Sequence, residues 1–191
     1  MIHRNRIAAV LLCSASACAW VAGASAADIV VHNPDEQGEM LPAVSGVNGK
    51  WEFSGGLADP GDYVFRAGGS FSLPLGERFG AQGDVMVANT ADGVSYGAAG
   101  HLFTRDPSAY LLGVTSGIVV APGGSLGALG VEAELYHGQW SLEAWAGVAA
   151  VDYSDALMTD ETGVFAIGDI ALYPSENLRL AVGGSSILGD N

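Results

Sequence analysis

The stretch Trp140–Val151, WSLEAWAGVAAV, alternates between two kinds of side chain. All its even-numbered positions are apolar: Trp140, Leu142, Ala144, Ala146, Val148 and Ala150. The positions between them hold Ser141, Glu143, Trp145, Gly147, Ala149 and Val151. Because successive side chains of a β-strand point to opposite faces, one face is continuously apolar and the other carries a charge. The stretch therefore predicts a strand between an apolar and a more polar environment.

The same alternation recurs along the chain, and turn residues separate the alternating segments. The segments that we expect to be strands are Val47–Ser54, Tyr63–Leu75, Phe79–Ala88, Ser95–Phe103, Ala109–Val120, Gly127–Tyr136, Trp140–Val151, Val164–Tyr173 and Leu178–Ser185. Only Ala109–Val120 is too uniformly apolar for its two faces to be assigned. In an exported chain this pattern is typical of membrane barrels. The sequence predicts an all-β fold, an antiparallel up-and-down transmembrane β-barrel with about nine visible strands.

Residues 1–26 have the three parts of a signal peptide. A basic start with Arg4 and Arg6 precedes the apolar stretch Ile7–Gly23, and the small residues Ala24-Ser25-Ala26 form a cleavage site before Ala27. Residues 27–43 are largely polar and are expected to form an irregular periplasmic segment. Residues 44–191 are expected to form the β-barrel domain.

Composition excludes several classes of protein. Both cysteines, Cys13 and Cys18, lie in the leader, so the mature chain has neither a disulfide framework nor a thiolate metal site. The chain has seven Lys and Arg residues against 21 Asp and Glu residues, and two of the seven, Arg4 and Arg6, also lie in the leader. Nucleic acid is therefore not an expected partner, because binding it normally needs a patch of Lys and Arg. No apolar run after the leader is long enough for a transmembrane helix.

The links between the expected strands differ in length. Those after the second, fourth, sixth and eighth strands are tight, whereas Gly55–Asp62 and Asp152–Gly163, after the first and seventh, are longer and more acidic. Outer-membrane barrels have short periplasmic turns and longer outer loops, and single-chain bacterial barrels have an even number of strands. Because nine is odd, we expect the domain to be incomplete at its C-terminus, with ten or more strands in its full form.

Charged side chains of the expected strands fall on the polar face. The candidate barrel-interior residues are Lys50, Glu52, Arg66, Asp84, His101, Glu132, Glu134, Glu143, Asp169 and Arg179. Small barrels are filled by side chains, so such charges have to pair or meet water. Two interpretations remain open: a structural polar plug, or a pore lining whose acidic excess favours cations.

No catalytic, cofactor or metal site is expected. His101 lies near Arg105 and Asp106 along the chain, and some outer-membrane enzymes pair a histidine with a serine and an acid, but the chain has no Gly-x-Ser-x-Gly motif. The acidic loop has no EF-hand spacing; its members are Asp152, Asp155, Asp160 and Glu161.

Two segments carry a resemblance to known proteins. GAAGHLFTRDPSAYLLGV at Gly97–Val114 and VEAELYHGQWSLEAWAGV at Val131–Val148 resemble a family of uncharacterised alphaproteobacterial envelope proteins, which have similar HLFxRDP and AEAELY segments. The resemblance covers most of Gly49–Gly184. It implies a small, porin-like outer-membrane β-barrel whose members continue beyond the position of Asn191. It implies no activity and no catalytic residue.

We therefore expect an outer-membrane β-barrel with a porin-like or structural envelope role and without catalysis. Its expected partners are outer-membrane lipid and the barrel-assembly machinery; the oligomeric state is not predicted. One alternative is a soluble periplasmic β-barrel that binds a lipid or another apolar ligand. A further alternative is an outer-membrane acyl-modifying enzyme. The charged face discriminates between the first two, because charges on the inside of a barrel must be matched across strands.

Overall fold

The computed structural model describes residues 41–58, 62–90, 93–175 and 178–189, and all regular structure in these ranges is β-strand. The strands are β1 Asn48–Ala58, β2 Asp62–Leu75, β3 Phe79–Thr90, β4 Gly93–Asp106, β5 Tyr110–Ala121, β6 Gly124–His137, β7 Trp140–Tyr153, β8 Glu161–Ser175 and β9 Leu178–Gly189. Each expected segment overlaps one strand, so the all-β prediction is confirmed. The expected signal peptide and most of the expected periplasmic segment lie outside the described residues. Among the described residues, none belongs to a helix long and apolar enough to cross a membrane.

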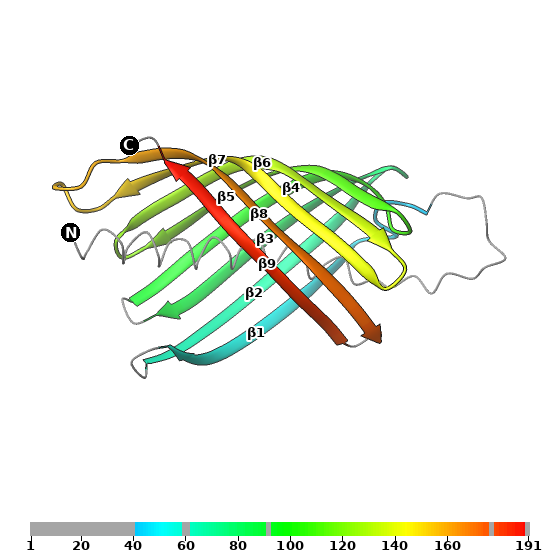
Figure 1. Cartoon of the computed structure of the whole chain (residues 1–191), viewed down its shortest axis with the longest axis horizontal. Coiled ribbons are helices and arrows are strands. Elements are labelled where there is room, and N and C mark those ends of the chain that lie inside the picture. The colour runs from blue at the N-terminus through cyan, green and yellow to red at the C-terminus, as the bar shows by residue number, and fades with distance from the viewer. Residues whose placement is uncertain (1–40, 59–61, 91–92, 176–177, 190–191) are drawn as a thin grey trace.

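The nine strands form one sheet in the order of the sequence, and each pairs antiparallel with the next. The predicted up-and-down antiparallel topology is therefore confirmed. Figure 1 shows that the sheet curls into a half-barrel of tilted strands. β1 and β9 are the two edge strands of the sheet, and no hydrogen-bonded ladder joins them within the described residues.

The two faces of the curled sheet differ in chemistry. Large apolar side chains are exposed on the convex face, including Trp51 at 78% and Tyr63 at 79%. The concave face holds buried polar side chains, such as Asp84 at 7% and His101 at 6% exposure. The sheet thus differs from that of a water-soluble barrel, where the interior is apolar and the outer face polar: here the outer face is apolar, and the concave face holds both polar and apolar buried side chains.

The structure assigns the faces of β5, which the sequence left open. Thr115 and Val119 are buried, whereas Leu112, Val114 and Ile118 are exposed. Period-two alternation is present, but both sets contain aliphatic residues. The sequence of β5 is therefore almost uniformly apolar, although Thr115 places a buried hydroxyl group on the concave face.

The concave face also carries one apolar cluster. Leu126 of β6, Ala149 of β7 and Phe165 of β8 form its buried centre. The Trp145 ring meets the Phe165 ring edge-on, with centroids 4.6 Å apart and an interplanar angle of 71°. Partly buried apolar side chains surround this centre: Ala121, Ala128, Trp145, Val151 and Ile167.

The prediction of a long link after the first strand is wrong. Gly55 and Gly56 belong to β1 and pair with Phe65 and Val64, so only residues 59–61 separate β1 from β2. Glycines weaken strands in isolation, but an existing ladder partner holds these two in extended conformation. Between β7 and β8 the connection is residues 154–160, shorter than the expected link because both strands continue further.

The turn between β6 and β7 depends on a glycine. His137 and Trp140 pair across the two-residue loop Gly138-Gln139, and Gly138 has a φ of +59°. A positive φ at the first loop position alone corresponds to a type II′ turn. Gly138→Ala is expected to lower the free energy of unfolding by about 1 kcal/mol or more, because alanine is strained at positive φ. Urea unfolding against the control Gln139→Ala checks this, and equal midpoints for the two variants would contradict it.

Residues 41–47 pass the end of the sheet where β2 turns into β3. The Ala43 amide donates to the Glu77 carbonyl at 2.9 Å, and both Ala43 and Val44 are buried. Val44 and the ring of Phe103 both pack against Gly80, where a Cβ would lie 2.6 Å from a Val44 methyl. Because Gly80 has no side chain, Val44 of this segment can pack against the concave face of the sheet.

Candidate functional site

A polar cluster on the concave face is centred on His101. His101 Nδ1 lies 2.9 Å from Glu132 Oε2, and its Nε2 lies 2.7 Å from Asp84 Oδ2. Thr115 Oγ1 is also 2.9 Å from Nδ1. β3, β4, β5 and β6 supply one residue each, and all four residues are buried.

The cluster continues into a hydrogen-bonded chain. The Gln82 amide donates to both carboxylate oxygens of Asp84, at 3.0 and 3.1 Å. The Ser72 hydroxyl donates to Gln82 Oε1 at 3.0 Å. The network therefore runs from β2 to β6 through buried side chains, which are held by hydrogen bonds and by the ion-pair contact of His101 with Asp84.

The geometry around His101 sets its charge. An ionised carboxylate can only accept hydrogen bonds, so close contact with Glu132 and Asp84 requires a proton on each ring nitrogen. His101 is then a cation between two anions. Thr115 can accept from Nδ1–H but cannot give its own proton to that nitrogen. Asp84, His101 and Thr115 lie in the order acid, histidine and hydroxyl, as in a catalytic triad. A doubly protonated His101 cannot be the general base that would activate the Thr115 hydroxyl.

A second charged group lies at the β1 side of the sheet. Arg66 Nη2 contacts Glu52 Oε1 at 3.1 Å. Lys50 lies near enough to interact electrostatically with Glu52, Asp84 and Glu134. Arg66 and Lys50 are thus placed beside acidic residues on the concave face.

Three carboxylates stand in line across β6, β7 and β8. Glu134 is the register partner of Glu143, and Glu143 is the partner of Asp169. The Tyr136 hydroxyl donates to Glu134, and the Ser141 hydroxyl donates to Glu143 at 3.2 Å. This carboxylate row gives the concave face a concentration of acidic groups at this point. Like charges that lie directly opposite one another on neighbouring strands repel.

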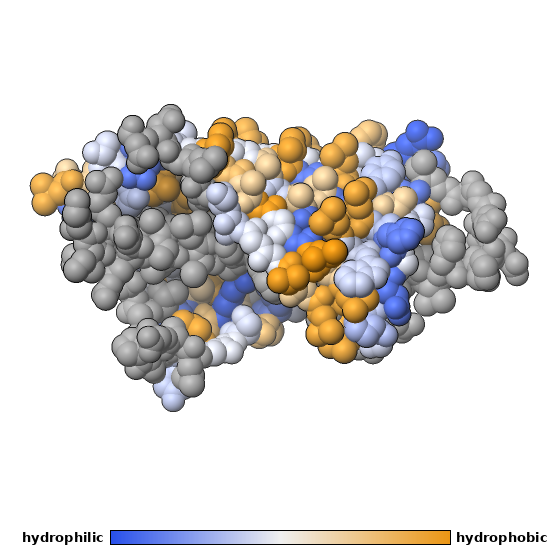
Figure 2. Space-filling model, in the orientation of Figure 1, coloured by the Kyte–Doolittle hydropathy of each residue, from blue (hydrophilic) through white to orange (hydrophobic). Residues whose placement is uncertain are grey.

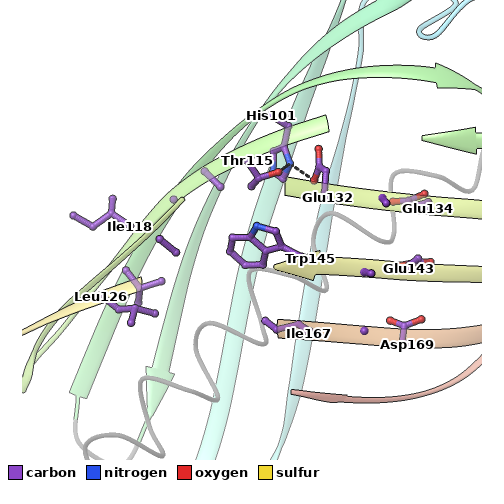
Figure 3. Close-up of a pocket in the computed structure, with 17 residues that line it drawn as sticks. His101, Thr115, Ile118, Leu126, Glu132, Glu134, Glu143, Trp145, Ile167 and Asp169 are labelled. Atoms are coloured by element: carbon purple, nitrogen blue, oxygen red, sulfur yellow. Dashed lines mark hydrogen bonds and ion pairs between the residues drawn. The ribbon is translucent and has the colours of Figure 1, made fainter. Parts of the chain in front are cut away.

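A pocket of about 70 Å³ opens beside the carboxylate row. Figure 3 shows Leu126, Trp145 and Ile167 on one side of it, with Glu134, Glu143 and Asp169 extending along the other. His101 and Thr115 lie at one end of the pocket and belong to its lining. Apolar and acidic surfaces therefore meet in one small space.

The structure brings most of the predicted interior residues together on the concave face. Those that lie in the clusters above are Lys50, Glu52, Arg66, Asp84, His101, Glu132, Glu134, Glu143 and Asp169. The side chain of Arg179 lies outside the described part of the chain. Thr115, Gln82 and Ser72 were not predicted as partners of the charged residues, although period-two alternation already set Gln82 and Ser72 opposite the apolar residues.

Asp106, which follows His101 in the sequence, and two residues of the acidic loop accept hydrogen bonds from their own turn or loop. Asp106 accepts from the backbone amide of Ser108 at 3.0 Å and from its hydroxyl at 2.6 Å, which stabilises the β4–β5 turn. In the acidic loop, Asp155 and Asp160 accept backbone amides of Leu157 and Tyr153. Within the described ranges, no three His, Cys, Asp or Glu side chains are grouped to hold a metal ion.

The charge state of His101 leads to a prediction about ester cleavage. Wild type and Thr115→Ala are expected to hydrolyse nitrophenyl esters and phospholipid at the same rate as protein-free buffer, because Thr115 has no base to activate it. Colorimetric ester release and lipid analysis measure this. A wild-type rate above buffer that falls in both Thr115→Ala and His101→Ala would contradict it.

Comparisons with known proteins add no assignment. The chain matches no protein-family model, no curated protein and no solved structure. The chemistry of the two faces of the sheet and the pocket are therefore the features that bear on its function.

Proposed function

We propose that this chain forms the wall of an outer-membrane β-barrel with a porin-like or structural role and without catalysis. The observation that carries the proposal is that large apolar side chains are exposed on the convex face of the curled sheet, while charged side chains are buried on its concave face. Figure 2 shows apolar patches between polar ones on the described part of the surface, and the exposed apolar residues on the strands include Trp51, Phe53, Tyr63 and Val182. Soluble monomers seldom expose so many large apolar side chains on one face, whereas lipid-facing strands require them.

Strand length and pairing support the same proposal. The shortest strand, β1, has 11 residues, and the longest, β8, has 15. A tilted strand needs about 9–11 residues to cross the hydrocarbon core. Every two neighbouring strands are joined by an antiparallel ladder, with one register shift between β8 and β9. Except along the outer edges of β1 and β9, these ladders satisfy the backbone groups that lipid cannot.

The concave face favours this proposal over the soluble alternative. A soluble barrel that holds a lipid needs an apolar interior, but here Asp84, His101 and Glu132 are buried inside and matched across strands. The network from Ser72 to Glu132 also occupies the interior with bonded side chains. This favours a structural plug over a wide, water-filled pore.

Cell fractionation and bilayer recording test the proposal. The full chain, expressed in a Gram-negative host, is expected in the outer-membrane fraction and to migrate differently in SDS gels before and after boiling. Its partners there would be outer-membrane lipid and the barrel-assembly machinery. Recovery as a soluble periplasmic protein would overturn the membrane location. In a planar bilayer, a silent inserted protein would leave the structural role and remove the porin-like one.

A further inference from the structure

Two hydrogen-bond donors lie close together in the lining of the pocket. The Trp145 Nε1 is buried and has no acceptor among the described residues. It stands over Gly130, where a Cβ would lie 2.7 Å from it. Gly130 is the register partner of Thr115, and directly opposed side chains begin about 5 Å apart. Figure 3 shows the indole nitrogen at the edge of the ring that faces Thr115, so the two donors are near the same point.

The Thr115 hydroxyl has a proton to donate. Its oxygen lies 2.9 Å from His101 Nδ1, and His101 carries a proton on each nitrogen because Glu132 and Asp84 both contact its ring. The oxygen of Thr115 therefore accepts from His101, and its own proton is available to another acceptor. A carbonyl oxygen has two lone pairs, so it can accept from the hydroxyl and from the indole N–H together.

The acidic groups of the lining favour a neutral ligand over a charged one. Each of these acids has an interaction partner within the protein: Glu132, Glu134, Glu143 and Asp169. They therefore do not require a cation from outside. The described lining includes neither Lys nor Arg, so an anion in the pocket would face like charges.

We propose that this pocket binds a neutral carbonyl compound with a short hydrocarbon chain. Its oxygen accepts hydrogen bonds from Trp145 and Thr115, and its chain lies against Leu126 and Ile167. A volume of about 70 Å³ accommodates a short hydrocarbon segment rather than a whole lipid. Because Nε1 is buried, the indole is expected to tilt away from Gly130 as the oxygen enters. A buried N–H without an acceptor is costly, and the carbonyl relieves that cost.

The proposed site depends on the concave face and not on what surrounds the convex face. It therefore stands or fails separately from the membrane location, and its test is a binding measurement on the purified protein.

Three probes of similar size test the pocket: 2-hexanone, 2-methyl-1-hexene, which has a methylene group in place of the carbonyl oxygen, and hexanoate. Each is titrated into the full-length protein labelled with ¹⁵N-tryptophan, in a non-ionic detergent and at matched free concentrations. The indole signal that is missing in Trp145→Phe, and still present in Trp140→Phe, identifies Trp145. The ketone is expected to move its N–H proton downfield saturably and to bind about three- to tenfold more tightly than the alkene, while hexanoate leaves the signal in place.

Matched variants of Thr115 test the second donor. Thr115→Val is expected to weaken the ketone about three- to tenfold and to leave the alkene unchanged, while Thr115→Ser, which keeps the hydroxyl, binds both as wild type does. Circular dichroism checks that each variant keeps its β-structure. Equal ketone binding by the Val and Ser variants would overturn the role of Thr115. In the wild-type protein, equal binding of ketone and alkene, or tighter binding of hexanoate, would overturn the selection of a neutral carbonyl, and absence of a saturable Trp145 shift with the ketone would overturn the site itself.

Discussion

His101→Leu is expected to lower the free energy of unfolding by about 3–5 kcal/mol, because it removes one partner of a buried ion pair. The substitution removes the cation that lies 2.7 Å from Asp84 and 2.9 Å from Glu132, and it leaves both carboxylates buried. Thr115 loses a hydrogen-bond partner as well. Denaturant unfolding followed by tryptophan fluorescence measures the loss.

Two controls separate charge from packing in this prediction. His137→Leu changes an exposed histidine of β6 and is expected to alter stability by less than about 0.5 kcal/mol. Adding Asp84→Asn and Glu132→Gln to His101→Leu removes the stranded charges, so the triple variant is expected to recover most of the loss. A triple variant less stable than His101→Leu alone would show that the charges are not the cause.

Leu129→Arg is expected to destabilise the membrane-inserted protein by about 2–4 kcal/mol, and Leu135→Arg by about 0–1 kcal/mol. Both leucines lie on the convex side of β6 with nearly equal exposure, 58% and 57%. Leu129 is near the middle of the strand, whereas Leu135 is two residues from its end. Under the proposed function only the first arginine is forced into the hydrocarbon core.

Folding into lipid vesicles at graded urea concentrations gives both free energies. Because the two sites share residue type, strand and exposure, their difference reports depth in the bilayer. A soluble protein has no depth, so both substitutions would then stay within about 0.5 kcal/mol of wild type. Two small and equal effects would support the soluble periplasmic alternative.

The faces of the strands could be predicted from sequence, but their partners could not. Alternation placed Asp84, His101 and Glu132 on one face because a strand has a period of two. The contact between His101 and Glu132 joins residues 31 positions apart, and it depends on two successive turns that set the register of β4, β5 and β6. A shift of one residue in either turn would put them on opposite faces. The alternation within each strand does not show which register the turns impose.

The pocket was beyond sequence reasoning for a different reason. Trp145 was visibly on the polar face between Glu143 and Gly147, but an isolated strand gives no sign that Gly130 lies beneath the indole. The pocket also requires the sheet to curl, so that β4 and β8 contribute to one lining. Curvature is a property of the assembled strands and of their twist.

β1 and β9 run in the same direction, because eight reversals separate them. Direct pairing of these two edges would therefore introduce a parallel ladder into a sheet that is otherwise antiparallel. A single strand inserted between them would run opposite to both and would satisfy both rows of backbone groups with antiparallel geometry. The orientation of the edges thus acts as a parity rule: any odd number of added strands closes the wall without a parallel seam, and any even number leaves one.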